Sequence, residues 1–291
     1  MSTIGLCDNR KYVEGDPLMK TPDLVVPDIY RMLEKQKPDK DVDIEAVIAQ
    51  FEKECGNALR NAISEQEDRT GRLRLSAIGK PTRKLWNAYW GIRGEDLKGP
   101  TYIKFLYGHI VEAMVLGLAK LAGHEVTEEQ KEIEIEGIKG HQDCRLDGLL
   151  IDVKSASAYG FRKFKHNKLH EDDPFGYIPQ LKCYAYQESD SEYGWLALDK
   201  QSGELTLLRY DEKDKKAPYA KALDWDPAER VREIKEAMEG PLPSKCFDDI
   251  PDGKSGNRKL ASGCAWCDYK ETCWPGLRTF SYSSGPQFLT V

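Results

Sequence analysis

The stretch Gly140–Lys154, with the sequence GHQDCRLDGLLIDVK, decides the fold expected for this chain. Asp147-Gly148 is a two-residue hairpin signal, because both central positions of a type I′ turn require a positive φ. Pairing outward from this turn sets Asp143 opposite Asp152, and opposed Cβ atoms lie roughly 4.5 to 5.5 Å apart. Two carboxylates at that distance repel each other unless a hard divalent cation lies between them, so the hairpin predicts a metal site.

The same pairing places a third functional side chain beside the two acids. It sets His141 opposite Lys154, and side chains alternate along strands, so Lys154 shares a face with Asp143 and Asp152. The other face of the hairpin is expected to be buried, because it carries Cys144, Leu146, Leu149, Ile151 and Val153.

The composition is that of an ordinary globular protein. Of 291 residues, 40% are hydrophobic and 32% are charged, and 43 basic against 49 acidic residues give a net charge of -6. That balance argues against non-specific coating of nucleic acid, but it allows a local basic channel. No apolar run approaches the length of a membrane span and no signal-peptide pattern opens the chain, so we expect a cytoplasmic protein without a membrane partner. In that reducing compartment the cysteines are expected to be thiols or metal ligands.

Three segments are expected along the chain. Residues 1–40 contain several prolines and little apolar periodicity, which indicates an extended N-terminal arm with at most one short helix near Asp28 to Glu34. Residues 41–240 form the expected core and begin with an amphipathic helix from Asp43 to Ser64. Residues 241–291 form a cysteine-rich module that is expected to pack on the core.

One core helix carries polar side chains where apolar ones are expected. The segment FLYGHIVEAMVLGLAKLA, residues 105–122, is apolar nearly all round and predicts a buried helix. His109 and Glu112 lie at i, i+3 on one face of it, where unpaired polar groups are costly. Alone, His109 would be interpreted as a hydrogen-bonded core histidine, but Glu112 one turn later favours a site.

Two segments interleave basic and aromatic residues. Residues 69–93 suit a single nucleic-acid strand, whose phosphates attract cations and whose bases stack on rings; a solvated helix edge anchored by its tryptophans is the open alternative. Residues 155–168 predict a cationic, aromatic loop at the mouth of the acidic cluster, where a phosphate backbone would enter. A merely solvated loop is the alternative there. The residues expected to bind DNA in these segments are Arg83, Lys84, Trp86, Arg162, Lys163 and Lys165.

The remaining patterns predict strands and helices that complete the core. The helix expected over residues 177–188 presents Gln180 and Tyr184 on one side. The other predicted elements are a strand over 132–136, a hairpin of strands 195–198 and 204–210, and a helix over 227–238 capped by Asp226.

The C-terminal segment has the spacing of a metal-binding module. Its cysteines follow the pattern C-x17-C-x2-C-x5-C, and two thiolates at the x2 spacing can chelate one ion from adjacent turns. Zinc and an iron–sulfur cluster both accept four cysteines, so ligand number leaves both open. The four residues are Cys246, Cys264, Cys267 and Cys273.

Several motifs, taken in order, resemble those of the PD-(D/E)XK nucleases of the RecB branch. The cysteine triplet resembles that of iron–sulfur members such as AddB-type and CRISPR-adaptation nucleases, and phage recombination exonucleases look similar too. The resemblance spans about residues 75–274, and motifs in one order are more specific than the Asp152-x-Lys154 triplet alone. The motifs are Gly108-His109 with Glu112, residues 140–143, residues 151–154, Gln180-Leu181 with Tyr184, and the triplet Cys264, Cys267 and Cys273.

The resemblance implies an α/β protein with a restriction-endonuclease-like core, in which a mixed β-sheet is flanked by helices, and a C-terminal four-cysteine metal module. It also implies phosphodiester cleavage that depends on Mg²⁺ or Mn²⁺. The implied metal ligands are Asp143, Asp152, the Val153 carbonyl, and His109, Glu112 or both.

The resemblance also assigns roles to residues around the metal. Lys154 would orient the attacking water and stabilise developing charge, while Gln180 and Tyr184 would support the site and the bound strand. The chain departs from the family in one respect: in iron–sulfur members the first cysteine lies in a segment like residues 76–86, which has none here. Cys246 is the expected substitute, which leaves [4Fe–4S] and Zn²⁺ both open.

The expected function is therefore a metal-dependent DNA exonuclease of phage-type recombination, replication or repair. It would act on single strands or duplex ends, with a recombination or replication protein as a partner. A sequence-specific endonuclease on the same core is one alternative, and a non-catalytic cysteine-module DNA-binding protein is another. Acyl transfer and nucleotide hydrolysis are poorly supported, because the motifs include no nucleophile–base pair and no glycine-rich phosphate loop.

Overall fold

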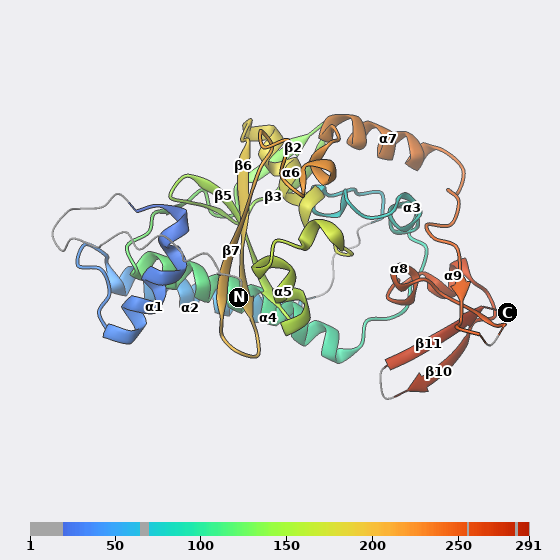
Figure 1. Ribbon diagram of the computed structural model, residues 1–291, viewed down its shortest axis with the longest axis horizontal. Coiled ribbons are helices and arrows are strands. Elements are labelled where there is room, and N and C mark those ends of the chain that lie inside the picture. Colours follow the sequence, from blue (N-terminus) through green and yellow to red (C-terminus); the bar gives the residue numbers. More distant parts are fainter. Residues whose placement is uncertain (1–19, 65–69, 255, 283–284, 291) are drawn as a thin grey trace, which may run out of the picture.

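A five-stranded mixed sheet in the order β1-β4-β5-β6-β7 forms the centre of the molecule (Figure 1). The computed structural model describes residues 20–64, 70–254, 256–282 and 285–290. Strands β5 and β6 run parallel, and the other neighbours in the sheet run antiparallel. The strands are β1 Val126–Thr127, β4 Cys144–Leu146, β5 Leu149–Ala156, β6 Glu192–Asp199 and β7 Leu205–Asp211.

Helices cover both faces of this sheet, because consecutive residues of β5 point to opposite sides. On one face, Ile151 and Val153 pack in a core with helices α1 and α4. On the other face, Leu150 and Trp195 pack in a second core with α5, α6 and α7. The mixed sheet flanked by helices is therefore confirmed. The helices are α1 Val25–Lys35, α4 Gly99–Leu121, α5 Ala158–Lys165, α6 Tyr177–Glu188 and α7 Pro227–Glu239.

The predicted hairpin forms with the expected register over its first three pairs. Asp147 and Gly148 have φ angles of 48° and 85°, as the turn requires, and Leu146 pairs with Leu149. The ladder ends at the pair of Cys144 and Ile151. Pairing of His141 with Lys154 is wrong, because His141 ends strand β3 (Ile138–His141), which pairs instead with β2 (Glu132–Ile135) in a separate two-stranded sheet.

The short helix expected near Asp28 to Glu34 is present in the N-terminal segment, but it is longer than expected and packs on the core. Residues 1–19 lie outside the described residues. From Val25 the chain forms the helix α1. Val25 and Ile29 are fully buried in the core between the sheet and helix α4. The helix begins three residues ahead of the expected range and has Pro27 in its first turn.

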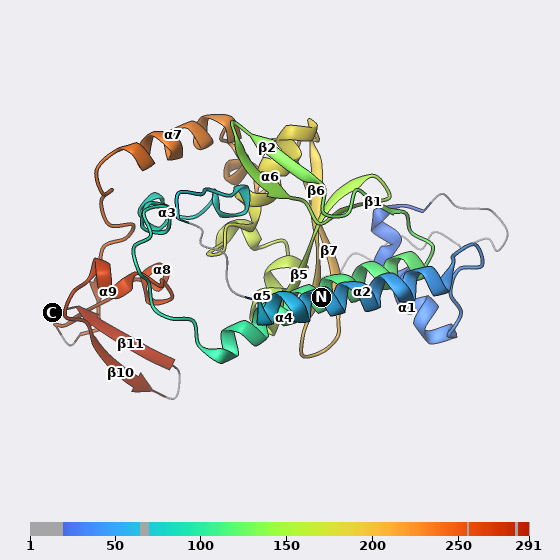
Figure 2. The same ribbon diagram turned by 180° about the vertical axis from the view of Figure 1, so that it is seen from behind.

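Helix α4 is longer than predicted, and it is not buried all round. Its C-terminal half packs on β5 and on helix α2 (Ile44–Ile63), which runs alongside it in Figure 2. In its N-terminal half Ile103, Phe105 and Tyr107 are more than half exposed. By length and composition α4 also meets the requirement for a membrane span, a test that core helices of many folds pass, so the absence of a membrane partner stays a prediction.

The segment downstream of β5 is a helix and not the loop that was expected. Ser157 accepts a hydrogen bond from the Gly160 N–H and caps α5, whose residues Phe161 and Phe164 are buried. Two aromatic residues three positions apart therefore anchor a helix face. The sequence pattern of alternating basic and aromatic residues reflects this amphipathic helix rather than irregular chain.

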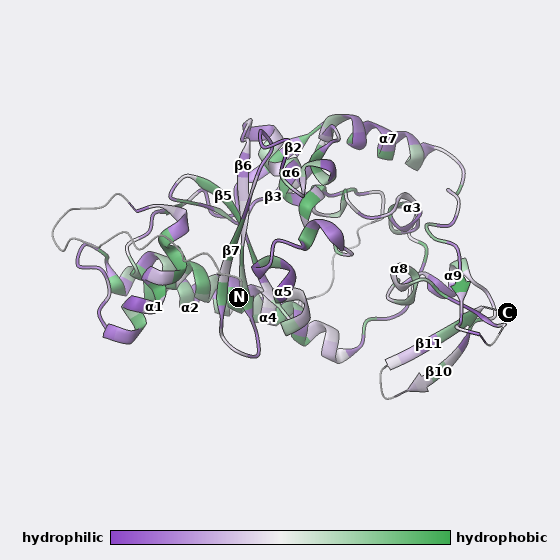
Figure 3. Cartoon of the chain, viewed as in Figure 1, coloured by the Kyte–Doolittle hydropathy of each residue, from purple (hydrophilic) through white to green (hydrophobic). Residues whose placement is uncertain are grey.

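The other predicted core elements are confirmed. Asp43 caps α2 by accepting from the Ala46 N–H, and Asp226 caps α7 by accepting from the Glu229 N–H. Strand β2, helix α6 and the β6–β7 hairpin lie where the patterns indicated. Hydrophobic residues concentrate along β5 and α4, whereas α7 is mostly hydrophilic on its outer side (Figure 3).

The chain after α7 forms a small four-stranded sheet in the order β10-β11-β9-β8, at the end of the molecule opposite α1 and α2 (Figures 1 and 2). The chain that leads into this sheet passes helix α3 (Thr82–Tyr89), where Arg83 donates to the Pro243 carbonyl. The elements of this segment are β8 Ile250–Pro251, β9 Arg258–Lys259, α8 Ser262–Ala265, α9 Lys270–Cys273, β10 Arg278–Tyr282 and β11 Gly285–Thr290. Four 3-10 helices, η1 Pro22–Leu24, η2 Leu75–Ala77, η3 Leu169–Glu171 and η4 Ala220–Leu223, link the larger elements.

Candidate active site

Asp143 and Asp152 lie together at the centre of the site. Asp152 is on β5 and only 1% exposed, and Asp143 directly precedes β4. Asp143 Oδ2 accepts a hydrogen bond of 2.8 Å from the Val153 backbone N–H, and the two carboxyl groups interact through a hydrogen bond of their own. The tight turn therefore brings the two acids into contact, as its register requires.

Lys154 extends from the same face of β5 toward the acids. Its Nζ lies 2.6 Å from Asp152 Oδ2, and its side chain is 17% exposed. Burial by itself lowers the pKa of Lys154, but the charges of Asp152 and Asp143 outweigh burial and raise it. The lysine thus remains a fixed positive charge beside the carboxylates.

The third acid, Glu112, comes from α4 on the opposite face of the sheet. Its Oε1 accepts a hydrogen bond of 2.8 Å from Gln130 Nε2. Burial raises the pKa of Glu112 to about 7, and the charge of Asp152 adds to this effect while Lys154 opposes it. Gln130 was not anticipated, because no local pattern connects a residue ahead of β2 with a helix in another layer.

The three carboxyl groups form one buried cluster. Burial raises the pKa of Asp143 to about 7, and Glu112 adds to that shift. Burial also raises the pKa of Asp152 to about 7, opposed by Lys154 and reinforced by Asp143. Acids that raise each other's pKa are a set of oxygen donors that a hard cation such as Mg²⁺ or Mn²⁺ would stabilise in the ionised form, so the residues fit such an ion.

In the described residues the carboxylates of Asp143, Asp152 and Glu112 are not arranged as a complete set of metal ligands. Across residues 20–64, 70–254, 256–282 and 285–290, no three His, Cys, Asp or Glu side chains stand in a metal-binding arrangement. The fit to a cation therefore rests on the chemistry of the donors and on their shared burial. Metal binding stays a proposal.

Helix α6 supports the acids from the other layer. Gln180 Nε2 makes a long hydrogen bond of 3.4 Å to Asp152 Oδ1, and Tyr184 interacts with Gln180 from one turn further on. Tyr184 is 1% exposed. A role of Tyr184 in DNA binding stays a prediction. Its ring packs against Gly140, where an added Cβ would lie 2.8 Å from Tyr184 Cε1.

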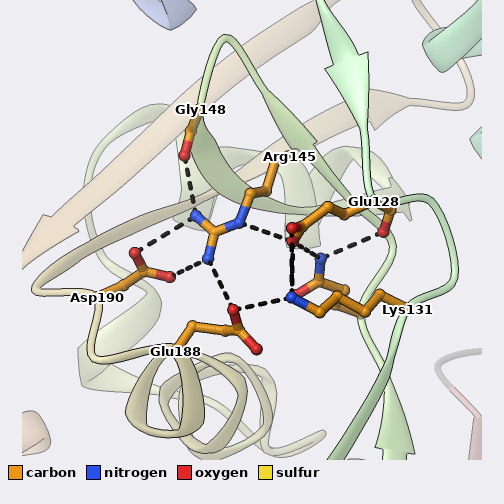
Figure 4. A network of polar contacts seen from close by, with 7 residues as sticks. Glu128, Lys131, Arg145, Gly148, Glu188 and Asp190 are labelled. Atoms are coloured by element: carbon orange, nitrogen blue, oxygen red, sulfur yellow. Dashed lines mark hydrogen bonds and ion pairs between the residues drawn. The ribbon is translucent and has the colours of Figure 1, made fainter.

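A network of ion pairs fixes the turn end of the hairpin (Figure 4). Arg145 Nη2 lies 2.6 Å from Asp190 Oδ2, and Arg145 Nε lies 3.0 Å from Glu128 Oε2. Lys131 joins the network by pairing with both Glu128 and Glu188. These contacts connect β4 to the end of α6 and to the chain ahead of β2, so they hold the strand that directly follows Asp143.

The histidines suggested by the sequence lie outside this cluster. His109 is one turn before Glu112 on α4 and is exposed. His141 Nε2 is 3.9 Å from Glu132 Oε2, and its side chain is 46% exposed, away from Lys154. A metal-binding role for His109, like one for the Val153 carbonyl, stays a prediction.

The basic residues of α5 are mostly engaged with acids. Lys163 Nζ donates to the Asp172 backbone carbonyl at 2.9 Å, and Lys165 forms an ion pair with Glu204. Arg162 is exposed, with its guanidinium 5.9 Å from the centre of the Tyr159 ring. Of the three predicted DNA contacts on this helix, Arg162 and Lys165 are exposed, and Lys165 is already paired with Glu204.

The basic and aromatic residues of α3 contact the C-terminal segment. Arg83 Nη1 donates to the Pro243 carbonyl at 2.6 Å, and Trp86 Nε1 donates to the Gly240 carbonyl at 3.3 Å. Lys84 Nζ lies 3.5 Å from Asp268 Oδ2. These side chains bracket the chain that leads into the cysteine segment, a structural role that their spacing alone could not distinguish from DNA binding.

The four C-terminal cysteines lie near one another. Burial raises the pKa of Cys264, and the thiols of Cys246, Cys267 and Cys273 add to this shift. The indole Nε1 of Trp274 is buried without completing a hydrogen bond, and its interaction with Cys264 favours the thiolate. An unsatisfied donor beside a sulfur fits a metal-bound thiolate, although the described residues hold no ready metal-binding group.

Cys246 lies where the sequence analysis sought a substitute cysteine. The backbone N–H of Lys84, in helix α3, bonds to the Cys246 sulfur and favours its thiolate against the larger opposing effect of burial. Residues 76–86 thus approach the cysteine cluster although they contain no cysteine of their own.

Comparison with known proteins finds structural likeness at low sequence identity. No family model matches the chain, and no curated protein matches it. Among solved structures, the alkaline exonuclease LHK-Exo from Laribacter hongkongensis is similar with 16% identity and a TM-score of 0.41, over 59% of this chain and 91% of that chain. Its complex with dAMP gives 15% identity and a TM-score of 0.40 over the same shares, 59% and 91%. The protein SSO0001 is similar with 15% identity and a TM-score of 0.40, over 76% of this chain and 95% of that chain. Likeness at this level says nothing about activity, so the function is inferred from the carboxylate cluster itself.

Proposed function

We propose that this protein is a DNA exonuclease that depends on Mg²⁺ or Mn²⁺. The observation that supports the proposal is the buried cluster of Asp143, Asp152 and Glu112 beside the charged Lys154. An acidic cluster of this kind is unfavourable in a folded chain unless a cation neutralises it. Phosphodiester hydrolysis uses such a cation, because the ion screens the phosphate and acidifies water.

The residues of the site would have separate roles in metal binding and in stabilising the reacting phosphate. Asp143, Asp152 and Glu112 would hold the cation. Lys154 Nζ is the donor available to orient the attacking water or to stabilise charge on a non-bridging phosphate oxygen. Gln180 would help to orient Asp152 through the hydrogen bond that its amide donates.

The test combines cleavage with metal binding. The wild-type protein should degrade end-labelled linear DNA in Mn²⁺ and stop in EDTA, while Asp152→Asn and Lys154→Ala should abolish cleavage. Calorimetric titration with Mn²⁺ should detect binding to the wild type and not to Asp152→Asn. The control is Glu236→Gln, which changes an exposed acid on α7 and should alter neither result. Full metal-dependent activity in either site variant would overturn the proposal.

The alternatives give different outcomes in the same assays. A sequence-specific endonuclease would cut covalently closed circular DNA at defined positions, whereas an exonuclease requires an end. A non-catalytic DNA-binding protein would bind DNA without any cleavage in Mn²⁺. The proposal includes a cytoplasmic setting and a place in phage-type recombination, replication or repair, with a recombination or replication protein as a partner.

We further propose that Cys246, Cys264, Cys267 and Cys273 hold a [4Fe–4S] cluster or a zinc ion. The mutual influence of their thiols and the unsatisfied indole donor of Trp274 support this proposal. Protein purified without oxygen would show a broad visible absorption band if it holds a cluster, and would be colourless with about one zinc per chain if it holds zinc. Absence of both metals from freshly purified protein would refute it.

A further inference from the structure

An aromatic row leads from Lys154 to the protein surface. Lys154 Nζ lies 4.8 Å from the centre of the Tyr177 ring, and that ring stacks on Phe175 with centroids 5.4 Å apart and planes at 27°. Phe175 is 64% exposed. One face of a flat, apolar ring is thus offered to solvent a short distance from the lysine of the carboxylate cluster.

The loop that carries Phe175 is rigidly built. The Asp173 carboxylate accepts hydrogen bonds from the backbone N–H groups of Gly176 and Tyr177 at 3.0 Å and of Ile178 at 2.8 Å. Phe175 lies inside this set of bonds, immediately before helix α6. An exposed aromatic ring held in one place can stack on a partner without first losing conformational freedom.

A second exposed ring stands on the neighbouring helix α5. Tyr159 is 62% exposed, and Lys163 Nζ and the Arg162 guanidinium lie 5.0 Å and 5.9 Å from its ring centre. Lys163 also donates to the Asp172 carbonyl, which joins α5 to the Phe175 loop. Two exposed rings and the exposed Arg162 are therefore presented by adjoining segments.

We propose that Phe175 and Tyr159 form a stacking platform for unpaired bases of a DNA strand whose phosphates reach the carboxylate cluster. A ring can stack on the free face of an unpaired base, while bases inside a duplex have both faces covered by their neighbours. Arg162 and Lys154 supply positive charge for the intervening phosphates. This inference rests on the proposed function and specifies its substrate: a single strand, or a duplex end that has frayed.

Equilibrium binding without cleavage tests the platform directly. Fluorescence anisotropy in EDTA compares a labelled single-stranded oligonucleotide with a blunt hairpin duplex of the same length. Phe175→Ala should weaken single-strand binding by about tenfold and change duplex binding by less than about twofold, and Tyr159→Ala should act in the same direction. Phe175→Trp should restore binding, because it replaces the ring with a larger one. Phe280→Ala, which removes a 43% exposed ring on β10, is the matched control and should bind like the wild type.

A spectroscopic readout separates stacking from a general loss of structure. An oligonucleotide with 2-aminopurine near its end should lose fluorescence on binding the wild type and Phe175→Trp, because stacking quenches the base, and should keep it with Phe175→Ala. Unchanged single-strand affinity and quenching in Phe175→Ala would overturn the platform. So would equal weakening of single-strand and duplex binding. Either result would leave the proposed nuclease intact if the wild type still cuts DNA in Mn²⁺, whereas absence of cleavage would remove the proposed function whatever the anisotropy shows.

Discussion

Replacing Glu112 by glutamine removes one charge from the buried acidic cluster while keeping the shape of the side chain. The amide oxygen of the new side chain can still accept the hydrogen bond that Gln130 donates. The apolar contacts of α4 with the sheet are unaffected. We therefore expect metal-free Glu112→Gln to be more stable than the wild type at alkaline pH, and about equally stable at acidic pH.

The size of the effect follows from the pKa of Glu112. Burial, with a smaller contribution from Asp152, raises this pKa from 4.5 in a free side chain to about 7 in the fold. Each pKa unit corresponds to about 1.4 kcal/mol, so ionising Glu112 costs roughly 3 kcal/mol more in the folded than in the unfolded chain. The pKa of Glu112 is higher in the folded chain than in the unfolded chain. The wild type therefore has its full free energy of unfolding below the unfolded pKa, and it loses this contribution as the pH rises through the folded pKa.

Urea unfolding in EDTA measures this difference. Curves are recorded for the wild type and for Glu112→Gln at two pH values. The difference between their free energies of unfolding should be small at about pH 5 and nearly complete at about pH 8. The control Glu236→Gln replaces an exposed acid on α7 and should match the wild type at both values. If Glu112→Gln were no more stable than the wild type at the higher pH, the carboxyl would not be buried in an acidic cluster, and the reasoning would fail.

Two further predictions concern the frame of the site, and a third concerns the C-terminal cysteines. Gly140→Ala should lower the free energy of unfolding by about 1–3 kcal/mol, because the new Cβ would lie 2.8 Å from Tyr184 Cε1. Gly108→Ala should raise the free energy of unfolding by up to about 1 kcal/mol, because its new Cβ would meet no atom within 4 Å. Paired denaturant curves measure both changes. Arg145→Ala should lower the free energy of unfolding by about 1–3 kcal/mol, a modest loss because the acidic partners of Arg145 are partly exposed. Thermal unfolding of this variant and of the milder Arg145→Lys measures the loss, and equal stability of both variants with the wild type would contradict it. Cys267→Ser should lose the metal proposed for the C-terminal segment, measured as metal content per chain, and a full complement of metal in the variant would contradict that role.

The part of the site that depends on short-range pairing could be predicted from the sequence. Asp147-Gly148 sets the turn, and the turn sets which side chains of β4 and β5 face each other, so the meeting of Asp143 and Asp152 follows from a few neighbouring residues. The register fails at His141, because β3 leaves the hairpin to pair with β2. The residues of the hairpin alone do not indicate that β2 pairs with the segment ahead of it.

Partners that come from distant parts of the chain could not be predicted. Lys165 and Arg83 are basic residues among aromatic ones, a pattern that DNA-binding and structural roles share. Only the fold shows that Glu204 and the Pro243 carbonyl engage them. For the same reason, Gln130 was missed as the partner of Glu112, and the exposure of Phe105 and Tyr107 on α4 was not foreseen.

Glu112 and Gln180 approach Asp143 and Asp152 from helices that lie on opposite sides of the sheet. The acidic centre therefore exists only while α4 is docked, since withdrawal of that helix removes one carboxylate and leaves two. A cation that all three oxygens ligate would bind the docked arrangement alone, and by linkage it would slow the local opening of α4. Amide hydrogen exchange along that helix, with and without Mn²⁺, would then report occupancy of the centre independently of any DNA.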